Sequence, residues 1–214
     1  MFLKHSIPVV PTLAQDYPEW HKGRTAFSLW YLEVHSPELL NYLEQLRAEF
    51  SDFLFQPNTR QFHITLFICG FWEPYRQFDD DFIFQQLDAQ TLQLQELNLS
   101  PFKLKTGKIN SFESALFIEI EDSEQALQQI RQQLSPCSSE IAPLSYCPHI
   151  TLGLYSHAFN GNELFRRADE IEQQSFELKI QQLTFGAYAA QQLQGPQPGL
   201  PGLLCHRKAF HRRL

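Results

Sequence analysis

Cysteine is scarce in this chain and poorly placed for metal binding or cross-linking. None of the four cysteines belongs to a C-x-x-C pair, and their positions match no zinc-binding spacing. The chain has 214 residues, of which 43% are hydrophobic, so a sizeable core can form without disulfide bonds. The cysteine pattern therefore excludes a zinc-stabilised module and a small disulfide-rich domain.

Long apolar runs are also missing. No stretch approaches the roughly 18 apolar residues of a membrane span, and the opening MFLKHSIPVVPTLAQ, with one lysine and two prolines, is a poor signal peptide. The P-loop, the Rossmann fingerprint and the G-x-S-x-G elbow are absent as well. The net charge of −7 argues against general binding to long nucleic acids. We expect a monomeric cytoplasmic protein that does not bind membranes.

The segments that are present alternate between strand and helix patterns. Four of them have the composition of buried strands: 27–34, 61–70, 115–121 and 146–155. Between the first two lies a helix pattern at 36–50, with Ser36 as the N-cap and Pro37 in the first turn. Between the last two lies a second helix pattern, capped by Asp122 or Ser123.

The two halves of the chain form an internal duplication of a strand–helix–strand unit. The tetrapeptide HITL occurs at 63–66 and again at 149–152, and the strand ahead of each copy keeps the same offset of 86 residues. We predict an extended N-terminal arm followed by a single domain. The predicted boundaries are 1–24 for the arm, 25–214 for the domain, about 25–110 for repeat 1, about 111–190 for repeat 2, and 191–214 for a C-terminal strand with a basic tail.

Each copy of HITL places a histidine and a threonine on one face of a strand, because residues i and i+2 point to the same side. If the two halves pack about a pseudo-twofold axis, the four side chains converge on one site: His63, Thr65, His149 and Thr151. Two imidazoles suit displacement at phosphorus, because a neutral one takes a proton from the attacking group and a protonated one delivers a proton to the leaving oxygen. The threonine hydroxyls can then hydrogen-bond the phosphate oxygens.

Two other interpretations of the histidine pair are open at this point. Both histidines can be structural, with their ring nitrogens satisfied by backbone carbonyls in the core. Both can bind zinc, although no third ligand follows at a recognisable spacing: the chain has no H-x-H and no H-E-x-x-H motif. We predict neither a metal nor a cofactor.

Twin H-x-T motifs in a duplicated α+β chain resemble the 2H phosphoesterase superfamily, which contains the 2′-5′ RNA ligase-like proteins and the 2′,3′-cyclic nucleotide phosphodiesterases. The resemblance spans about residues 25–190 and is most specific at QFHITLFICG and PHITLGLY. It implies a bilobal fold, in which two antiparallel sheets with outer helices face each other across a central cleft. It also implies metal-free catalysis by His63 and His149, with phosphate bound by Thr65 and Thr151.

The resemblance and strand parity point to further residues of the cleft. The resemblance implies that Trp30 and Tyr155 approach the substrate, and strand parity also places Tyr155 on the active face. Parity assigns Gln61 and Cys147, each two residues before its histidine, to the lining of the cleft.

Positive charge near the site is expected from the segment ahead of the first strand, where His21, Lys22 and Arg24 lie. Many ligase-like members of the family carry an arginine just after the second motif. This chain has Leu152-Gly153-Leu154 there, so the resemblance does not extend to specific binding of an RNA end.

The sequence thus predicts a metal-independent phosphoesterase that hydrolyses a 2′,3′-cyclic phosphate or a related 2′-linked diester on a nucleotide or a short RNA. The negative net charge favours a small substrate over a long RNA. An RNA ligase or a 3′-end-trimming enzyme of the same family is an alternative, and so is a catalytically idle module that binds nucleotides or RNA ends. The motifs leave open which histidine is the acid and which is the base.

Overall fold

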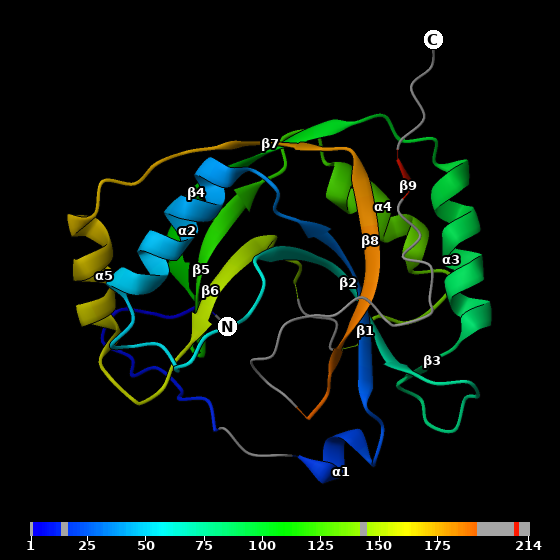
Figure 1. The fold of residues 1–214 in the computed structure, drawn as a ribbon, viewed down its shortest axis with the longest axis horizontal. Coiled ribbons are helices and arrows are strands. Elements are labelled where there is room, and N and C mark those ends of the chain that lie inside the picture. Colours follow the sequence, from blue (N-terminus) through cyan, green and yellow to red (C-terminus); the bar gives the residue numbers. More distant parts are fainter. Residues whose placement is uncertain (1, 14–16, 142–144, 192–207, 210–214) are drawn as a thin grey trace.

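The predicted strand–helix–strand unit occurs twice along the chain (Figure 1). The computed structural model describes residues 2–13, 17–141, 145–191 and 208–209. In this part of the chain the strands are β1 (Ala26–Glu33), β2 (His63–Trp72), β3 (Asp81–Phe82), β4 (Phe102–Ser111), β5 (Ala115–Glu121), β6 (His149–Leu154), β7 (Glu177–Ile180), β8 (Gln182–Ala189) and β9 (Lys208–Ala209). The helices are α1 (Pro18–His21), α2 (Pro37–Glu49), α3 (Phe84–Glu96), α4 (Ala126–Leu134) and α5 (Gly161–Glu170). The two units are β1-α2-β2 and β5-α4-β6. The predicted α+β class is confirmed.

The described strands form one curled sheet, in the order β7-β4-β5-β6-β2-β1-β8-β9, with β3 attached to β2 (Figure 1). Among the strand pairs of the described residues, only β2–β3 is parallel. In the middle of the sheet, β2 and β6 run antiparallel and are joined where Ile64 pairs with Ile150. The expectation of two separate sheets is therefore wrong, because this central contact joins the two halves into one continuous sheet.

The two repeats exchange elements within this sheet. The last strand of repeat 1, β4, pairs with β5 of repeat 2, and the last strand of repeat 2, β8, pairs with β1 of repeat 1. The helices cross over in the same way, because α2 contacts β6 and α4 contacts β2. In Figure 1, α2 and α5 lie on the side of β4, β5 and β6, whereas α3 and α4 lie on the side of β2 and β8. Each half of the sheet is thus completed by the other repeat.

The first predicted helix begins as expected, whereas its counterpart in repeat 2 is displaced. The hydroxyl of Ser36 accepts a hydrogen bond from an amide in the first turn of α2, as an N-cap does. Helix α4 begins only at Ala126, after Gln125, whose φ of 55° is left-handed. The carboxylate of Asp122 still accepts hydrogen bonds from the amides of Ala126 and Leu127, at 3.0 and 2.8 Å. The capping interaction is kept, but a turn separates Asp122 from the helix.

Each HITL strand contains a β-bulge directly after its threonine. Strand β2 has one extra residue, Leu66, relative to β1, and strand β6 has one extra residue, Leu152, relative to β5. The carbonyl of each bulged leucine accepts a hydrogen bond from an arginine of the other repeat. Arg131 of α4 donates to Leu66 (2.5 Å), and Arg47 of α2 donates to Leu152 (3.0 Å). The two motifs are therefore held in the same way, each by the opposite repeat.

The two faces of the sheet bury apolar side chains unequally. Residues alternate along β1, so Trp30 and Leu32 face the helices, where they belong to the main core. Phe27 and Tyr31 point to the opposite face. There Phe27 packs with Phe71 of β2 in a second, smaller apolar cluster. The histidines share this second face, as the next subsection describes.

The N-terminal segment 2–13 runs along repeat 2, where the amides of Leu3 and Val9 donate to the carbonyls of Ser111 and Phe159. Helix α1 follows as a single turn, so the predicted arm is not extended throughout. At the other end of the chain β9 pairs with β8, and the rest of the predicted basic tail lies outside the described residues. Among the described helices, none combines the length and the apolar character needed to cross a bilayer.

We predict that Arg131→Met lowers the free energy of unfolding by about 2–4 kcal/mol, because it removes the arginine that pairs with the Glu140 carboxylate and bonds the buried carbonyl of Leu66. Arg131 and Glu140 are only 17% and 15% exposed, and they form an ion pair at 2.5 Å. Arg166→Met is the matched control, because the Arg166–Glu170 pair on α5 is about 60% exposed and is worth about 0.5 kcal/mol or less. Urea unfolding of both variants checks the prediction, and equal losses would contradict it.

Candidate active site

The four predicted motif residues meet at the centre of the sheet. His63 and His149 are the first residues of β2 and β6, the two strands joined at Ile64 and Ile150. The antiparallel register of that pair sets His63 against Thr151 and Thr65 against His149, on the face opposite the two isoleucines. Both isoleucines are fully buried in the main core. The structure thus brings the four side chains to one place, as the duplication predicted.

The two imidazoles are oriented by equivalent hydrogen bonds. The Nδ1 atom of His63 lies 2.9 Å from the carbonyl oxygen of Gln61, and the Nδ1 atom of His149 lies 2.7 Å from the carbonyl oxygen of Cys147. Because a carbonyl oxygen only accepts, each Nδ1 carries the proton and donates it. Each Nε2 is then the basic atom of its ring, and that of His63 lies 3.3 Å from the hydroxyl of Thr65. Gln61 and Cys147 act here through their backbone, which strand parity did not reveal.

An aromatic ring packs against each histidine from the neighbouring strand. The ring of Tyr31 lies edge-on to His63 with 5.6 Å between centroids, and Phe117 lies 5.1 Å from His149. Tyr31 and Phe117 are related by the offset of 86 residues, so both belong to the duplicated unit. A second ring, Phe112, contacts His149 at 5.0 Å. These rings desolvate the imidazoles and limit their rotation.

The electrostatic surroundings favour neutral histidines. The pKa of His63 is lowered to about 4, mainly by burial and also by the positive charges of Arg60 and of a protonated His149, partly opposed by the hydrogen bond to Gln61. Burial also lowers the pKa of His149, and the charge of Arg60 acts in the same direction, partly opposed by the hydrogen bond to Cys147. His63 is 4% exposed, whereas His149 and both motif threonines are half-buried. The two imidazoles are therefore chemically unequal despite their matched geometry.

A polar pair on the neighbouring strands accompanies each histidine. Glu33 is the register partner of His63, and Glu119 is the register partner of His149. The hydroxyl of Thr184 donates to Glu33 at 3.0 Å, and the side-chain amide of Asn110 donates to Glu119 at 2.5 Å. The sequence reasoning missed these carboxylates, although the offset of 86 residues relates Glu33 to Glu119. The sequence signal for them was an acidic residue at the same position of both repeats, within strands that are mostly apolar.

The two predicted substrate contacts, Trp30 and Tyr155, lie in the core instead. Trp30 is 1% exposed and donates its indole N–H to Gln90 at 2.8 Å. Tyr155 is 0% exposed, and its hydroxyl is 2.5 Å from that of Ser111. The parity argument for Tyr155 is wrong because the bulge at Leu152 reverses the alternation of faces between His149 and Tyr155.

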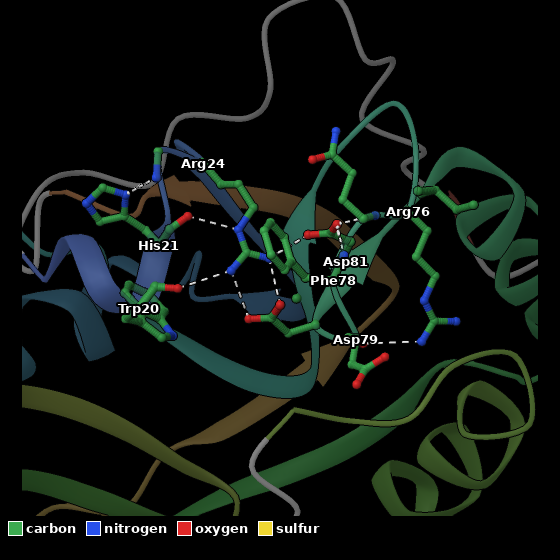
Figure 2. Close-up of polar contacts among 12 residues, drawn as sticks. Trp20, His21, Arg24, Arg76, Phe78, Asp79 and Asp81 are labelled. Carbon is green, nitrogen blue, oxygen red and sulfur yellow. Dashed lines mark hydrogen bonds and ion pairs between the residues drawn. The ribbon is translucent and has the colours of Figure 1, made fainter.

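The positive charge expected from His21, Lys22 and Arg24 is not at the site. Arg24 is 6% exposed, and its guanidinium binds Asp80 and Asp81 at the end of β1 remote from Glu33 (Figure 2). His21 is buried as well, and its Nδ1 accepts a hydrogen bond from the amide of Gly23. Lys22 is exposed and lies over the Phe78 ring, 4.3 Å from its centroid. This prediction failed because the aspartates that neutralise Arg24 lie more than 50 residues away in sequence.

The described residues contain no group of three or more histidine, cysteine, aspartate or glutamate side chains placed to hold a metal ion. The three cysteines in this part of the chain are unpaired thiols: Cys69, Cys137 and Cys147. What the site does contain is two imidazoles, two hydroxyls and the nearby cation of Arg60. Those groups can move protons and bind an anion.

Comparison with known proteins places this chain in a family. A model of the 2′-5′ RNA ligase superfamily matches residues 35–192, more than half of the chain and including both motifs. The chain belongs to the 2′-5′ RNA ligase superfamily. No curated protein sequence matches it.

Solved structures show that the fold is shared with E. coli LigT and with a protein described as a phosphoesterase. The structure of E. coli LigT complexed with 3′-AMP superposes with a TM-score of 0.51 at 14% identity, and the match covers 76% of this chain and 88% of LigT. A structure described as a phosphoesterase superposes with a TM-score of 0.50, with the same identity and coverage. At this identity the likeness establishes the fold of the superfamily and leaves the reaction to be argued from the site.

We predict that this superfamily member loses stability as the pH falls, in part because of His63. Its pKa is about 6.5 in the unfolded chain and about 4 in the fold, so between these values the unfolded chain binds the extra proton. The stability contributed by neutral His63 is present above about pH 6.5 and is lost towards pH 4, by about 3 kcal/mol in total.

Urea unfolding at about pH 7 and about pH 4.5 measures this effect. His63→Gln should show a smaller loss between the two conditions than the wild type, whereas His157→Gln, at an exposed position, should match the wild type. The same loss in His63→Gln as in the wild type would show that His63 has an ordinary pKa.

Proposed function

We propose that this protein is a metal-independent phosphoesterase. Its substrate is a 2′,3′-cyclic phosphate or a related 2′-linked phosphodiester on a nucleotide or a short RNA. The observation that carries the proposal is the matched pair of imidazoles. Each Nδ1 is held by the carbonyl two residues back, which leaves both Nε2 atoms to transfer protons at one shared site.

In this proposal His63 is the general base and His149 is the general acid. The low pKa of His63 keeps it neutral and ready to accept a proton, and the pKa of His149 is lowered less strongly. Nε2 of His63 takes a proton from water as the water oxygen attacks phosphorus. The bond from phosphorus to the leaving oxygen breaks, and Nε2 of His149 gives that oxygen a proton. Proton exchange with solvent then restores both histidines.

The threonines supply hydrogen bonds to the phosphate. Thr65 and Thr151 share the face of the histidines and are half-buried, so their hydroxyls can reach the non-bridging oxygens. Charge accumulates on those oxygens in the transition state, where such hydrogen bonds contribute most. Because the two imidazoles provide both proton transfers, the mechanism needs no metal ion. A nucleotide substrate is supported by the 3′-AMP in the complex of E. coli LigT, which shares this fold.

Turnover of the four nucleoside 2′,3′-cyclic monophosphates in the presence of EDTA tests the proposal directly. We expect hydrolysis of at least one of them to a single monophosphate isomer, whose identity shows which oxygen receives the proton from His149. Stoichiometric binding without turnover would instead favour a nucleotide-binding module. Loss of activity with EDTA, restored by a divalent metal, would contradict the metal-independent mechanism.

We predict that His63→Gln and His149→Gln each lower kcat by about 10²- to 10⁴-fold, the usual loss when a general acid or base is removed. Glutamine keeps a polar side chain of similar length, so the fold should persist, as circular dichroism can verify. His157→Gln is the matched control, because His157 is exposed and outside the site. If either site variant keeps the activity of this control, the assignment of that histidine is wrong.

We also predict that kcat/KM peaks at acidic pH. The active free enzyme has His63 neutral and His149 protonated. The rate should therefore rise as His63 loses its proton near pH 4, and it should fall as His149 loses its proton below the ordinary value of about 6.5. A pH profile with the slowly reacting His149→Gln variant should lack the alkaline limb. A wild-type optimum above pH 7 would contradict the assignment.

A further inference from the structure

The backbone of Arg60 is held by hydrogen bonds, whereas the Nε atom of its side chain has no partner among the described residues. Arg60 lies three residues before His63, directly ahead of β2. Its amide donates to Asn58 at 3.3 Å, and its carbonyl accepts a hydrogen bond from Arg47 at 3.0 Å. The Nε atom of its guanidinium is buried, yet it has no hydrogen-bond partner among the described residues. A buried donor in this state is destabilising unless a ligand satisfies it.

The guanidinium lies among the titratable groups of the site. Its charge acts on His63 and His149, whose pKa values it lowers, and on Tyr188 of β8. Burial raises the pKa of Tyr188 to about 12, so the tyrosine is neutral and offers no negative charge. Burial lowers the pKa of Arg60 itself, because the cation is poorly hydrated.

Arg60 also differs from the other arginines with low exposure. Each of those has a carboxylate partner: Arg24 with Asp80 and Asp81, Arg47 with Glu44, Arg131 with Glu140, and Arg167 with Asp52. Within the described part of the chain, no carboxylate forms an ion pair with Arg60. A poorly hydrated cation without a counter-ion is unfavourable in a folded protein, and functional sites are where such groups are retained.

We infer that Arg60 binds the phosphoryl group on which His63 and His149 act, and that the anionic substrate is its counter-ion. This inference rests on the proposed function and adds a binding residue to it. The planar guanidinium can donate two parallel hydrogen bonds to two non-bridging oxygens of a phosphodiester, which a hydroxyl cannot do. Arg60 would then hold the anion from the side of repeat 1, alongside Thr65.

The second repeat offers no equivalent cation. The offset of 86 residues relates Arg60 to Tyr146, whose hydroxyl donates to the backbone carbonyl of Thr65 at 3.0 Å. The residues that follow the second motif, Leu152-Gly153-Leu154, are uncharged. Arg60 is thus the positive charge that the described residues place beside both histidines, and a single phosphate monoanion matches it.

Inorganic phosphate is the probe for this inference, with binding followed by calorimetry and by the NMR signals of the histidine rings. Arg60→Gln should weaken phosphate binding by about 10- to 100-fold, as expected when a hydrogen bond to a charged group is lost. Arg60→Lys keeps the charge but loses the planar pair of donors, so its affinity for phosphate should lie between those of Arg60→Gln and the wild type. Arg76→Gln is the matched control, because Arg76 is exposed and its side chain donates a hydrogen bond to the backbone carbonyl of Asp79 in a surface loop (Figure 2).

Two further readouts separate phosphate binding from a merely structural role. Without phosphate, Arg60→Gln should be at least as stable as the wild type to urea, because an unpaired cation has been removed, and the pKa values of both histidines should rise in the NMR titration. A variant that binds phosphate like the wild type would overturn the inference. So would a clear loss of stability in both Arg60→Gln and Arg60→Lys.

The same variants distinguish this inference from the proposed function. Phosphate binding that depends on Arg60, in a protein that hydrolyses neither the cyclic nucleotides nor 2′-5′-linked oligonucleotides, would keep the anion site and overturn the hydrolase. Hydrolysis of a cyclic nucleotide with unchanged kcat and KM in Arg60→Gln would keep the hydrolase and overturn the role of Arg60.

Discussion

The site depends on a pair of hydrogen bonds between the repeats. In each, an arginine of one repeat bonds the motif strand of the other. Arg47 and Arg131 bond the carbonyls of the bulged residues Leu152 and Leu66, which are themselves fully buried. A buried carbonyl without a partner costs about 1–3 kcal/mol, so the bulges persist because these arginines satisfy them, joined at Leu152 by the side-chain amide of Asn58, which donates at 2.8 Å. Each guanidinium also lies 3.9 Å over an aromatic ring in the segment that leads into a motif. Neither repeat can therefore complete its own H-x-T strand.

This reciprocal dependence explains why the chain forms one sheet. The bulges set the twist of β2 and β6 just beyond Thr65 and Thr151, where the strands separate after pairing at Ile64 and Ile150. That single pairing is enough, because the crossed helices and the exchanged outer strands hold the two halves from outside. The four motif side chains consequently lie on rigid strands, which suits a site that must hold two imidazoles at fixed positions.

Local patterns predicted the parts of this arrangement that depend on local rules. The i, i+2 rule and the offset of 86 residues were sufficient to bring His63, Thr65, His149 and Thr151 together. The same rule failed for Tyr155, because a bulge inserts one residue and the alternation of faces does not reveal it. The expectation of positive charge from Arg24, which rested on its position ahead of the first strand, failed because aspartates distant in sequence cancel that charge. The sequence did not single out Arg60, because its lack of a carboxylate partner depends on which residues surround it in the fold.

The duplication supplies a symmetric frame, but the chemistry proposed for it requires asymmetry. Two identical imidazoles at one phosphate would have equal intrinsic pKa values, so neither would be the preferred acid, whereas hydrolysis needs a particular one to be neutral and the other protonated. Arg60, present in one repeat and replaced by Tyr146 in the other, breaks the symmetry. It lowers the pKa of both rings, and that of His63 falls further.

A bound phosphate would offset this charge and favour a proton on the half-buried His149. Substrate binding and proton uptake are then coupled, because the negative charge of the substrate favours the protonated form of His149 that acts as the acid. On this account a neutral phosphotriester of the same shape would fail twice, because it would leave Arg60 without a counter-ion and His149 without its proton.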